Sequence, residues 1–390
     1  KFIILIVIVL GIVAISQLAR VYELAAKLKG KKEEDISESD NRMNARLMFA
    51  FMVVFFITVI YFFNTYGRGL LPEAASVHGV EQDWLMDLNV IIITTVFFLT
   101  NFLLFFFASK YYKRKGSKAY FFPPDTQLEL IWTVIPSIVL AVIIILGLRN
   151  WNEVTGPPSE DAEKVELYSK QFSWTARYSG EDNVLGDFNY KLVNDDINNP
   201  LGVVTRVTIE TQIEALKGKI VDEKAKLNSD SLVFADEIEY KMHKKVERLS
   251  RVVRRLEEEL ASYNDSLDIP AMDDKIVRGD LHLKVNQEYE FQFRAEDVIH
   301  SAYFPHFRAQ MNTVPGMKTR FTFTPTITTT EMRKKLEDEN FNYVLLCNKI
   351  CGASHSNMYM LVQVDDEATY DAWLAEQPTF KSTVIDELKK

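Results

Sequence analysis

Four long apolar segments in the first 150 residues constrain this chain more than any other feature. They occupy residues 2–19, 47–63, 88–108 and 130–148. Each approaches the ~20 residues with which a helix crosses ~30 Å of hydrocarbon, and none has the polar stripe at a period of 3.6 residues that marks a packed core helix. We therefore predict four membrane helices. The first is taken as a retained helix, since it lacks the A-x-A cleavage site of a signal sequence.

Lysine and arginine are unevenly distributed among the connections between these segments. Residues 20–46 contain seven of them and residues 109–118 contain five, whereas residues 64–87 contain only Arg68. Because positively charged connections stay on the cytoplasmic side, we predict that the amino terminus and everything after residue 150 lie outside. The soluble part of the chain is then periplasmic or otherwise exoplasmic.

The net charge and the cysteine count narrow the possible partners. A net charge of −9 argues against nucleic acid and favours a basic protein partner for the soluble part. Two cysteines in 390 residues are too few for a disulfide framework.

The second half of the chain has the pattern of an all-β domain. From about Tyr168 onward, short segments of strand-forming residues are separated by Gly, Pro and Asn. Examples are DLHLKV, YEFQFRA, TRFTFTPT, NYVLLC and MYMLVQV. Short segments of this kind predict a β-sandwich or a Greek-key barrel.

One long interruption divides the predicted strands. Residues 209–260 have no strand pattern, and apolar residues recur there at spacings of four and three in two runs. The first run is Ile209, Ile213, Leu216, Ile220 and Leu227, with one step polar at Glu223, and the second, unbroken run is Met242, Val246, Leu249, Val253, Leu256 and Leu260. With a turn at 228–231, they predict an antiparallel helical hairpin inserted into the β domain. Its charged residues are interpreted as a solvated face, with docking of a partner as the alternative.

Both cysteines lie in one loop, CNKICGASHSNM. Cys347, Cys351, His355 and Met358 place two thiols, an imidazole and a thioether within twelve residues. Such ligands select copper over magnesium or calcium, and methionine is not among the usual ligands of zinc. A mononuclear blue-copper site would leave one cysteine over, whereas two cysteines suit two copper ions, because each sulfur can bridge both. The spacing predicts a dinuclear copper site, with a disulfide as the alternative.

A dinuclear site needs a second histidine. His78 lies between two apolar segments, and His243 lies in the predicted hairpin. His300 and His306 fall in a turn-rich stretch that follows a strand, and either one could reach the loop.

The loop pattern C-x-x-x-C-G-x-x-H-x-x-M resembles the dinuclear copper loop of subunit II of the haem–copper oxidases that use cytochrome c. D-V-I-H-S, with V-P-G some fifteen residues later, is similar to the segment that supplies the family's first histidine ligand. The resemblance implies a cupredoxin fold and two copper ions. The implied ligands are the side chains of His300, Cys347, Cys351, His355 and Met358 and the backbone carbonyl of Lys349. His306 matches a position that is not a ligand in the family.

A second motif, L-E-L-I-W-T-V-I-P at 128–136, is similar to the family's second membrane helix. There the glutamate that matches Glu129 helps to admit protons to subunit I.

The resemblance covers about residues 85–200 and 265–370. We accordingly divide the chain into an additional N-terminal helix with a cytoplasmic loop (1–46), a second additional helix with an outer loop (47–84), the family's two-helix anchor (85–150), a cupredoxin domain in two parts (151–206 and 265–372) around the hairpin (207–264), and a C-terminal tail (373–390).

Three positions depart from the family's pattern. Lys349 replaces a glutamate that helps to bind Mg or Mn at the boundary with subunit I. An ammonium group cannot ligate a cation, so we expect this ion to be absent or differently held. Phe172 and Trp174 match the Q-W-x-W stretch where electrons arrive from cytochrome c. Phe172 replaces the first tryptophan and has no indole N–H, so we expect the donor to dock differently. Asn312 replaces an acidic residue near V-P-G.

Together these features predict subunit II of a cytochrome c oxidase in a bacterial inner (plasma) membrane, with a periplasmic copper domain. The resemblance implies a c-type cytochrome donor, free or bound in a complex, and haem in subunit I where oxygen is reduced to water and protons are translocated. Subunit III and membrane lipid are further implied partners. No C-x-x-C-H occurs, so this chain attaches no c-type haem. Two alternatives stay open: a copper-free quinol oxidase subunit II-like protein, and a scaffold subunit of a respiratory supercomplex.

Overall fold

The computed structural model describes residues 2–28, 36–67, 71–229 and 234–389. The chain divides into two compact units, Lys1–Leu70 with Leu88–Ser137, and Leu71–Asp87 with Ile138–Lys390. Several residues used in the predictions lie outside the described ones: Lys29, Lys31, Lys32, Arg68 and the second half of the predicted turn at 228–231.

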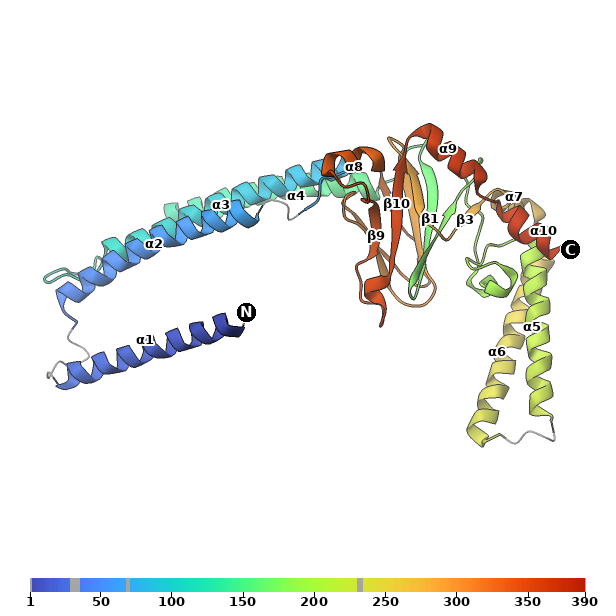
Figure 1. Cartoon of the computed structure of the whole chain (residues 1–390), viewed down its shortest axis with the longest axis horizontal. Coiled ribbons are helices and arrows are strands. Elements are labelled where there is room, and N and C mark those ends of the chain that lie inside the picture. Colours follow the sequence, from blue (N-terminus) through green and yellow to red (C-terminus); the bar gives the residue numbers. More distant parts are fainter. Residues whose placement is uncertain (1, 29–35, 68–70, 230–233, 390) are drawn as a thin grey trace. The chain divides into compact units, whose positions relative to one another are not determined.

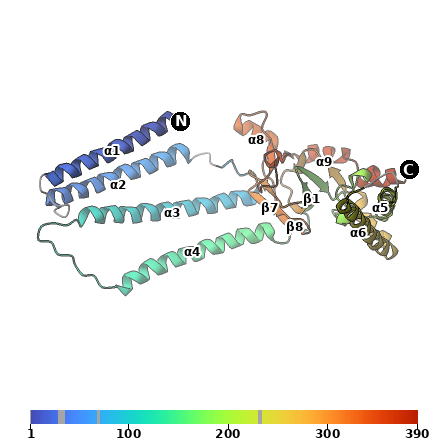
Figure 2. The same cartoon turned by 90° about the horizontal axis from the view of Figure 1, so that it is seen from below.

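Four helices account for the apolar segments, and each is long and apolar enough to cross a membrane. They are α1 (Phe2–Leu28), α2 (Glu38–Tyr66), α3 (Val77–Lys110) and α4 (Thr126–Thr155). Figure 2 shows that a long connection joins α3 to α4. Aromatic side chains pack α2 against α3, where Phe56 and Phe98 are in edge-to-face contact at 4.9 Å between ring centroids. The prediction of four apolar helices is confirmed.

The third helix begins well before its apolar segment. We expected a connection around His78, but α3 starts at Val77 and His78 is buried within it. The reason is a tertiary contact, because this end of α3 belongs to the same compact unit as the β domain. The guanidinium of Arg308 donates two hydrogen bonds of 2.8 Å to the carboxylate of Asp83, a bidentate geometry that is among the stronger side-chain contacts.

The second unit is built on two five-stranded sheets (Figure 1). One has the order β3-β2-β1-β5-β8, and the other has the order β4-β10-β9-β6-β7. The strands are β1 (Glu163–Lys170), β2 (Ser173–Tyr178), β3 (Lys275–Val277), β4 (Leu281–Lys284), β5 (Tyr289–Ala295), β6 (His300–Phe304), β7 (Ala309–Thr313), β8 (Thr319–Phe323), β9 (Tyr343–Cys347) and β10 (Tyr359–Asp365). The five strand segments quoted from the sequence correspond to β4, β5, β8, β9 and β10, so the prediction of an all-β domain is confirmed.

The stretch around His300 and His306 is more regular than predicted. The expected turn is present at residues 305–308 and contains His306, but the flanking residues form the antiparallel pair β6 and β7, in which His300 lies opposite Thr313. Four of the five residues of β6 are buried, on both faces of the strand. A strand that is buried on both faces has no alternation of apolar and polar residues, which is why the pattern did not identify it.

Aromatic side chains fill the space between the two sheets. Phe291 on β5 stacks on Phe323 on β8 at 4.8 Å, and Phe304 on β6 contacts both rings at 5.6 and 5.4 Å between centroids. Burying one such side chain stabilises a fold by roughly 1.5–3 kcal/mol. This core holds the sheet that carries β6 and β9 in place, and the cysteine loop depends on both strands.

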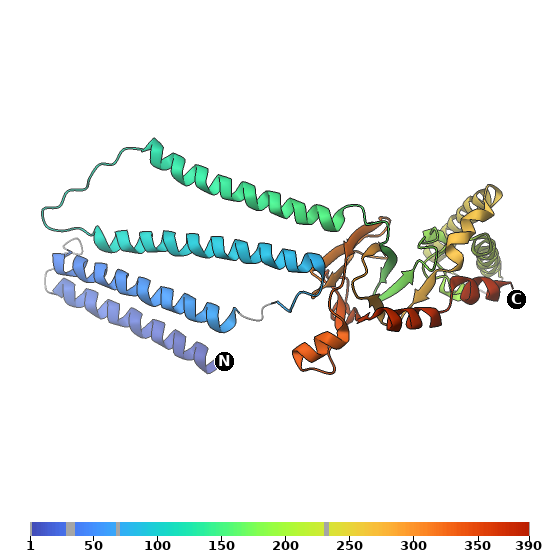
Figure 3. The same ribbon diagram turned by 90° about the horizontal axis from the view of Figure 1, so that it is seen from above.

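The interruption of the strands is a pair of helices, α5 (Arg206–Leu227) and α6 (Asp236–Ala261), which lie side by side in Figures 1 and 3. Thr205 caps α5 through reciprocal hydrogen bonds with Thr208. The core that the two helices share includes Ile209, Ile213, Leu216, Val253 and Leu256, all members of the predicted apolar runs. The predicted helical hairpin is confirmed.

Short helices complete the second unit. They are α7 (Ile269–Met272), α8 (Thr329–Leu336), α9 (Glu367–Glu376) and α10 (Asp386–Leu388). Phe380, Val384 and Ile385 are buried in a cluster with Tyr168 and Leu201. The last described residues therefore pack on the β domain.

Candidate metal centre

The cysteine loop connects two neighbouring strands. Cys347 is the last residue of β9, and its backbone N–H donates to the carbonyl of Met358, just before β10 begins. The N–H of Asn348 donates to the carbonyl of Ser301 on β6. These bonds satisfy the backbone at the start of the loop and tie it to the strand that carries His300.

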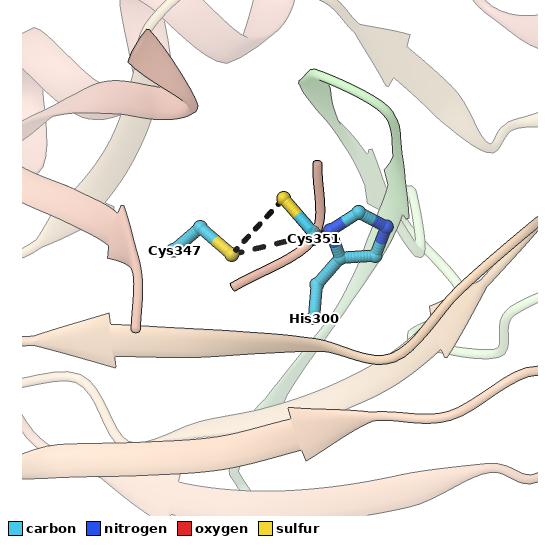
Figure 4. A group of neighbouring side chains, drawn as sticks. All are labelled: His300, Cys347 and Cys351. Carbon is cyan, nitrogen blue, oxygen red and sulfur yellow. Dashed lines mark hydrogen bonds between the residues drawn. The ribbon is translucent and has the colours of Figure 1, made fainter. Parts of the chain in front are cut away.

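Three buried side chains meet at this place: His300, Cys347 and Cys351 (Figure 4). Their ligand atoms all lie within 4.8 Å of one another. The sulfur of Cys347 lies 3.9 Å from the Nδ1 of His300 and 3.9 Å from the sulfur of Cys351. Direct pairing of β6 with β9, in which Ala302 lies opposite Cys347, brings His300 to the loop.

Two further side chains and one carbonyl join this cluster from the same loop. The sulfur of Cys351 lies 3.6 Å from the Nδ1 of His355 and 3.7 Å from the Sδ of Met358. The sulfur of Cys347 lies 3.2 Å from the carbonyl oxygen of Lys349. Met358 is buried and His355 is half-buried. All six positions that the resemblance implied as ligands thus meet at one place, which we call the ligand cluster.

Asp297, which the sequence analysis did not single out, orients His300. Its Oδ1 accepts a hydrogen bond from the Nε2 of His300 at 2.9 Å, and its Oδ2 accepts one from the backbone N–H of Gln171 at 2.9 Å. With Nε2 engaged in this bond, the Nδ1 of His300 is free to face Cys347. A carboxylate three residues before a candidate ligand is a signal that the sequence does contain.

The two thiols do not form a disulfide. Both cysteines are free and buried, and the 3.9 Å between their sulfurs is far longer than the ~2.05 Å of an S–S bond. Burial, followed by the proximity of Cys347, raises the pKa of the Cys351 thiol to about 11. Two neighbouring thiolates in a buried site are unfavourable unless a cation neutralises them.

The cluster fits copper in both geometry and chemistry. The separation of 3.9 Å between the sulfurs is less than twice a metal–thiolate bond of ~2.3 Å, so one ion can contact both. Thiolate, imidazole and thioether are the donors that copper prefers. Of the six positions, only the carbonyl of Lys349 offers an oxygen, so the set does not suit magnesium or calcium.

Two aromatic residues adjoin the ligand cluster. The indole of Trp174, on β2, is buried and makes an edge-to-face contact with the ring of His300 at 6.3 Å between centroids. The ring of Phe172 abuts Gly352, where an added Cβ would come within 2.9 Å of it. Gly352 also has a φ of +146°, a conformation that favours glycine. Both aromatic residues therefore contact the cluster or its immediate neighbour in the chain.

Other candidate residues do not reach the ligand cluster. His306 packs edge-on against two aromatic rings, and burial together with Arg308 lowers its pKa to about 4. Of the two histidines that the residues alone left open, the structure brings only His300 to the loop. Glu129 lies in the first turn of α4 and is exposed.

The positions that depart from the family's pattern bring no carboxylate to the loop. Lys349 exposes its side chain, while its carbonyl faces Cys347. Asn312 lies on β7 opposite Ser301. These two positions do not form an oxygen-rich site of the kind that Mg requires.

Comparison with known proteins identifies relatives for most of the chain. The family described as "Cytochrome C oxidase subunit II, transmembrane domain" matches residues 64–149. The "Alternative cytochrome c oxidase subunit 2" of Bradyrhizobium diazoefficiens is 27% identical over 266 residues, which are 68% of this chain and 69% of that protein. The "Cytochrome c oxidase subunit 2" of Thermostichus vulcanus is 31% identical over 102 residues, about a quarter of each chain.

Solved structures give a weaker match. The periplasmic domain of subunit II of cytochrome oxidase (CoxB) of Bradyrhizobium japonicum is 13% identical, with a TM-score of 0.27, and the match covers 60% of this chain and 98% of that one. A superposition at this level does not bear on the site.

Proposed function

We propose that this chain is a member of the cytochrome c oxidase subunit II family, which the matches of its membrane segment and of a relative that covers 68% of the chain support, and that it binds two copper ions and receives electrons singly from a c-type cytochrome. The observation that carries the proposal is the convergence of two free thiols, two imidazole Nδ1 atoms and a thioether at one place. When bound, copper held by these donors would supply a one-electron relay.

The residues of this chain would hold the copper as follows. Cys347 and Cys351 supply the thiolates, and His300 and His355 supply imidazole nitrogens. Met358 and the carbonyl of Lys349 are the weaker donors. Asp297 holds His300 in the tautomer that presents Nδ1. Because four of the five side-chain donors come from one closed loop and the fifth comes from a paired strand, little rearrangement of the protein would be needed when the charge changes.

The partners of this chain are inferred from the cytochrome c oxidase subunit II family. We propose that the chain assembles with subunit I, which carries the haem that accepts the electrons, and with subunit III. The four apolar helices lie in membrane lipid, and the β domain is on the periplasmic side of a bacterial plasma membrane. In this arrangement the oxygen chemistry and most of the proton translocation belong to subunit I. The acidic charge of the chain speeds the approach of a basic donor more than it tightens binding.

Glu129 is proposed to help admit protons from the cytoplasmic side. It is exposed in the first turn of α4, where a partner subunit can reach it. Glu129→Gln removes the ionisable group with little change in shape, so oxidase turnover should fall while the copper signal stays intact. Unchanged turnover and proton uptake in this variant would count against the role.

Electrons are proposed to arrive near Phe172, with Trp174 beside His300 as the inner aromatic contact. Phe172 presents a flat apolar surface without an indole N–H, which favours a donor that is held in a complex over one that diffuses freely. Fast turnover with soluble cytochrome c that disappears in Phe172→Ala would contradict this altered mode of docking.

The test of the copper proposal is metal analysis of the full chain together with its electron paramagnetic resonance spectrum. We expect two copper ions per chain and one unpaired electron whose hyperfine splitting reports both nuclei. A single copper with four-line splitting, or a metal-free chain with a disulfide after oxidation, would overturn the proposal. The second result would favour a copper-free subunit of the quinol oxidase type.

A further inference from the structure

Positive charge is concentrated on one part of the helical hairpin. Residues 241–255 of α6 contain seven lysine and arginine residues and a single acidic residue, Glu247, in a chain whose net charge is −9. Five of the seven recur at spacings of three and four, so they lie on one face of the helix. These are Lys241, Lys244, Arg248, Arg251 and Arg255, which we call the basic stripe, and all five are exposed.

The basic stripe is only partly neutralised within the chain. Lys241 pairs with Glu237 at 2.6 Å, while Lys244 and Arg251 share Glu247 at 3.4 and 2.8 Å. Arg248 and Arg255 form no ion pair with any residue that the structure describes.

Repulsion within the basic stripe is compensated only in part by the ion pairs with Glu237 and Glu247. Lys244 and Arg248, like Arg251 and Arg255, are like charges four residues apart, an arrangement that destabilises a helix. A partner that supplies negative charge would relieve it.

The basic stripe is carried on a fixed support. The opposite face of α6 packs on α5 through Val253 and Leu256, which are 7% and 0% exposed. Close to the base of the hairpin, Asn189 donates to Glu259 at 3.1 Å. Figures 1 and 3 show the two helices projecting from the sheets as one piece. Such a preorganised surface loses little conformational freedom when a macromolecule binds.

The chemistry of the stripe favours a protein over a membrane surface. A helix that binds at a lipid interface needs an apolar face to insert, and that face of α6 is occupied by α5. Three of the five stripe residues are arginines, whose planar fork binds carboxylates bidentately.

We propose that the basic stripe docks an acidic surface, rich in aspartate and glutamate, on another protein of the membrane assembly. This partner differs from the basic donor that suits the acidic chain as a whole, and the docking site lies outside the ligand cluster. The inference does not depend on the copper chemistry.

The experiment uses native membranes that contain the full chain. Carbodiimide forms zero-length amide bonds between lysine amines and carboxylates, so Lys241 and Lys244 report directly on acidic neighbours. Cross-linked peptides are sequenced at low and at high salt. The test variant carries Arg248→Glu, Arg251→Glu and Arg255→Glu. A control with the same change in net charge carries Lys219→Glu, Lys224→Glu and Lys226→Glu on α5, and a second control carries arginine-to-lysine changes at the three stripe positions.

We expect Lys241 or Lys244 to be joined to aspartate or glutamate of a different polypeptide, with a yield that falls as salt rises. The stripe variant should lower that yield by about tenfold or more, while both controls retain it. Intact oxidase turnover in the stripe variant would show that the chain still folds. Cross-links confined to peptides of this chain, including those of a second copy, or equal loss in the α5 control, would overturn the proposal.

Discussion

Two buried polar regions of the β domain differ in how their groups are satisfied. In one, which we call the ion cluster, Arg177 lies 2.7 Å from Glu166 and 2.9 Å from Asp274, and Arg294 also pairs with Glu166. None of these four residues is more than 5% exposed. Burial alone would raise the pKa of Glu166, but Arg177 and Arg294 outweigh it and hold the value at about 2.

The ligand cluster has the opposite character. Its sulfurs and imidazoles lie 3.6–3.9 Å apart, too far for strong hydrogen bonds, and no cationic side chain is among them. The ion cluster contains its own counter-charges, although one carboxylate oxygen of Asp274 has no hydrogen-bond partner, whereas the ligand cluster has no cationic side chain to offset two thiolates. Soft donor atoms that are gathered in one place without a counter-charge are therefore what distinguishes the ligand cluster from the ion cluster.

The largest effect is expected from Cys347→Ser, which tests the difference between the ligand cluster and the ion cluster. A hydroxyl is not a soft donor for copper, so the proposed paired-copper spectrum should vanish, and turnover should fall by more than the ~10–100-fold that the loss of an outer hydrogen-bond partner costs. Copper analysis and electron paramagnetic resonance of the variant check this. A full two-copper complement with the native spectrum would remove Cys347 from the ligand set.

Breaking the ion cluster should affect folding and leave the copper chemistry unaffected. Arg177→Met deletes the charge that Glu166 and Asp274 share, and removing one partner of a buried ionic group costs about 3–5 kcal/mol. Denaturant unfolding of the full chain measures the loss. The material that remains folded should still bind copper. A variant as stable as the parent would mean that the cluster contributes specificity and not stability.

A smaller effect is expected at Asp297, which supports the ligand cluster from outside. Asp297→Asn keeps the shape but weakens the hydrogen bond that orients His300, so copper retention against a chelator should fall by about tenfold. Hyperfine splitting from the His300 side should change as well. Asp338→Asn, an acidic-to-amide change on an exposed residue, is the matched control. Equal retention in the two variants would restrict Asp297 to a role in folding.

The smallest expected effect is a pH dependence outside both clusters. Burial and Arg308 lower the pKa of His306 from its usual 6.5 to about 4. Between these pH values the unfolded chain binds more protons than the folded one, so stability should fall as the pH drops through this window. His306→Gln should flatten the dependence of the melting temperature on pH between about 6.5 and 4. An unchanged slope would show that other groups produce it.

The sequence was most informative where the chemistry is local. Cys347, Cys351, His355 and Met358 are close in the chain, so their types and spacing predicted a copper loop before any fold was known. The sequence predicted secondary structure correctly where apolar residues recur with a clear period, as in the two apolar runs of the hairpin. It was missed at β6, where burial on both faces removes the alternation.

The sequence by itself determined the four apolar helices, the all-β domain with its helical insertion, and the grouping of soft donor side chains in the loop. Each of these rests on composition or short-range spacing, which bilayer thickness, helix geometry and ligand chemistry constrain directly. Only the tertiary structure decided that His300 and not His306 meets the cysteines, that Asp297 orients it, and that Asp83 of α3 pairs with Arg308. The contacts of His300 with Cys347 and of Asp83 with Arg308 join residues 47 and 225 positions apart, and they exist only because strand pairing and core packing bring distant parts of the chain together, which no local pattern encodes.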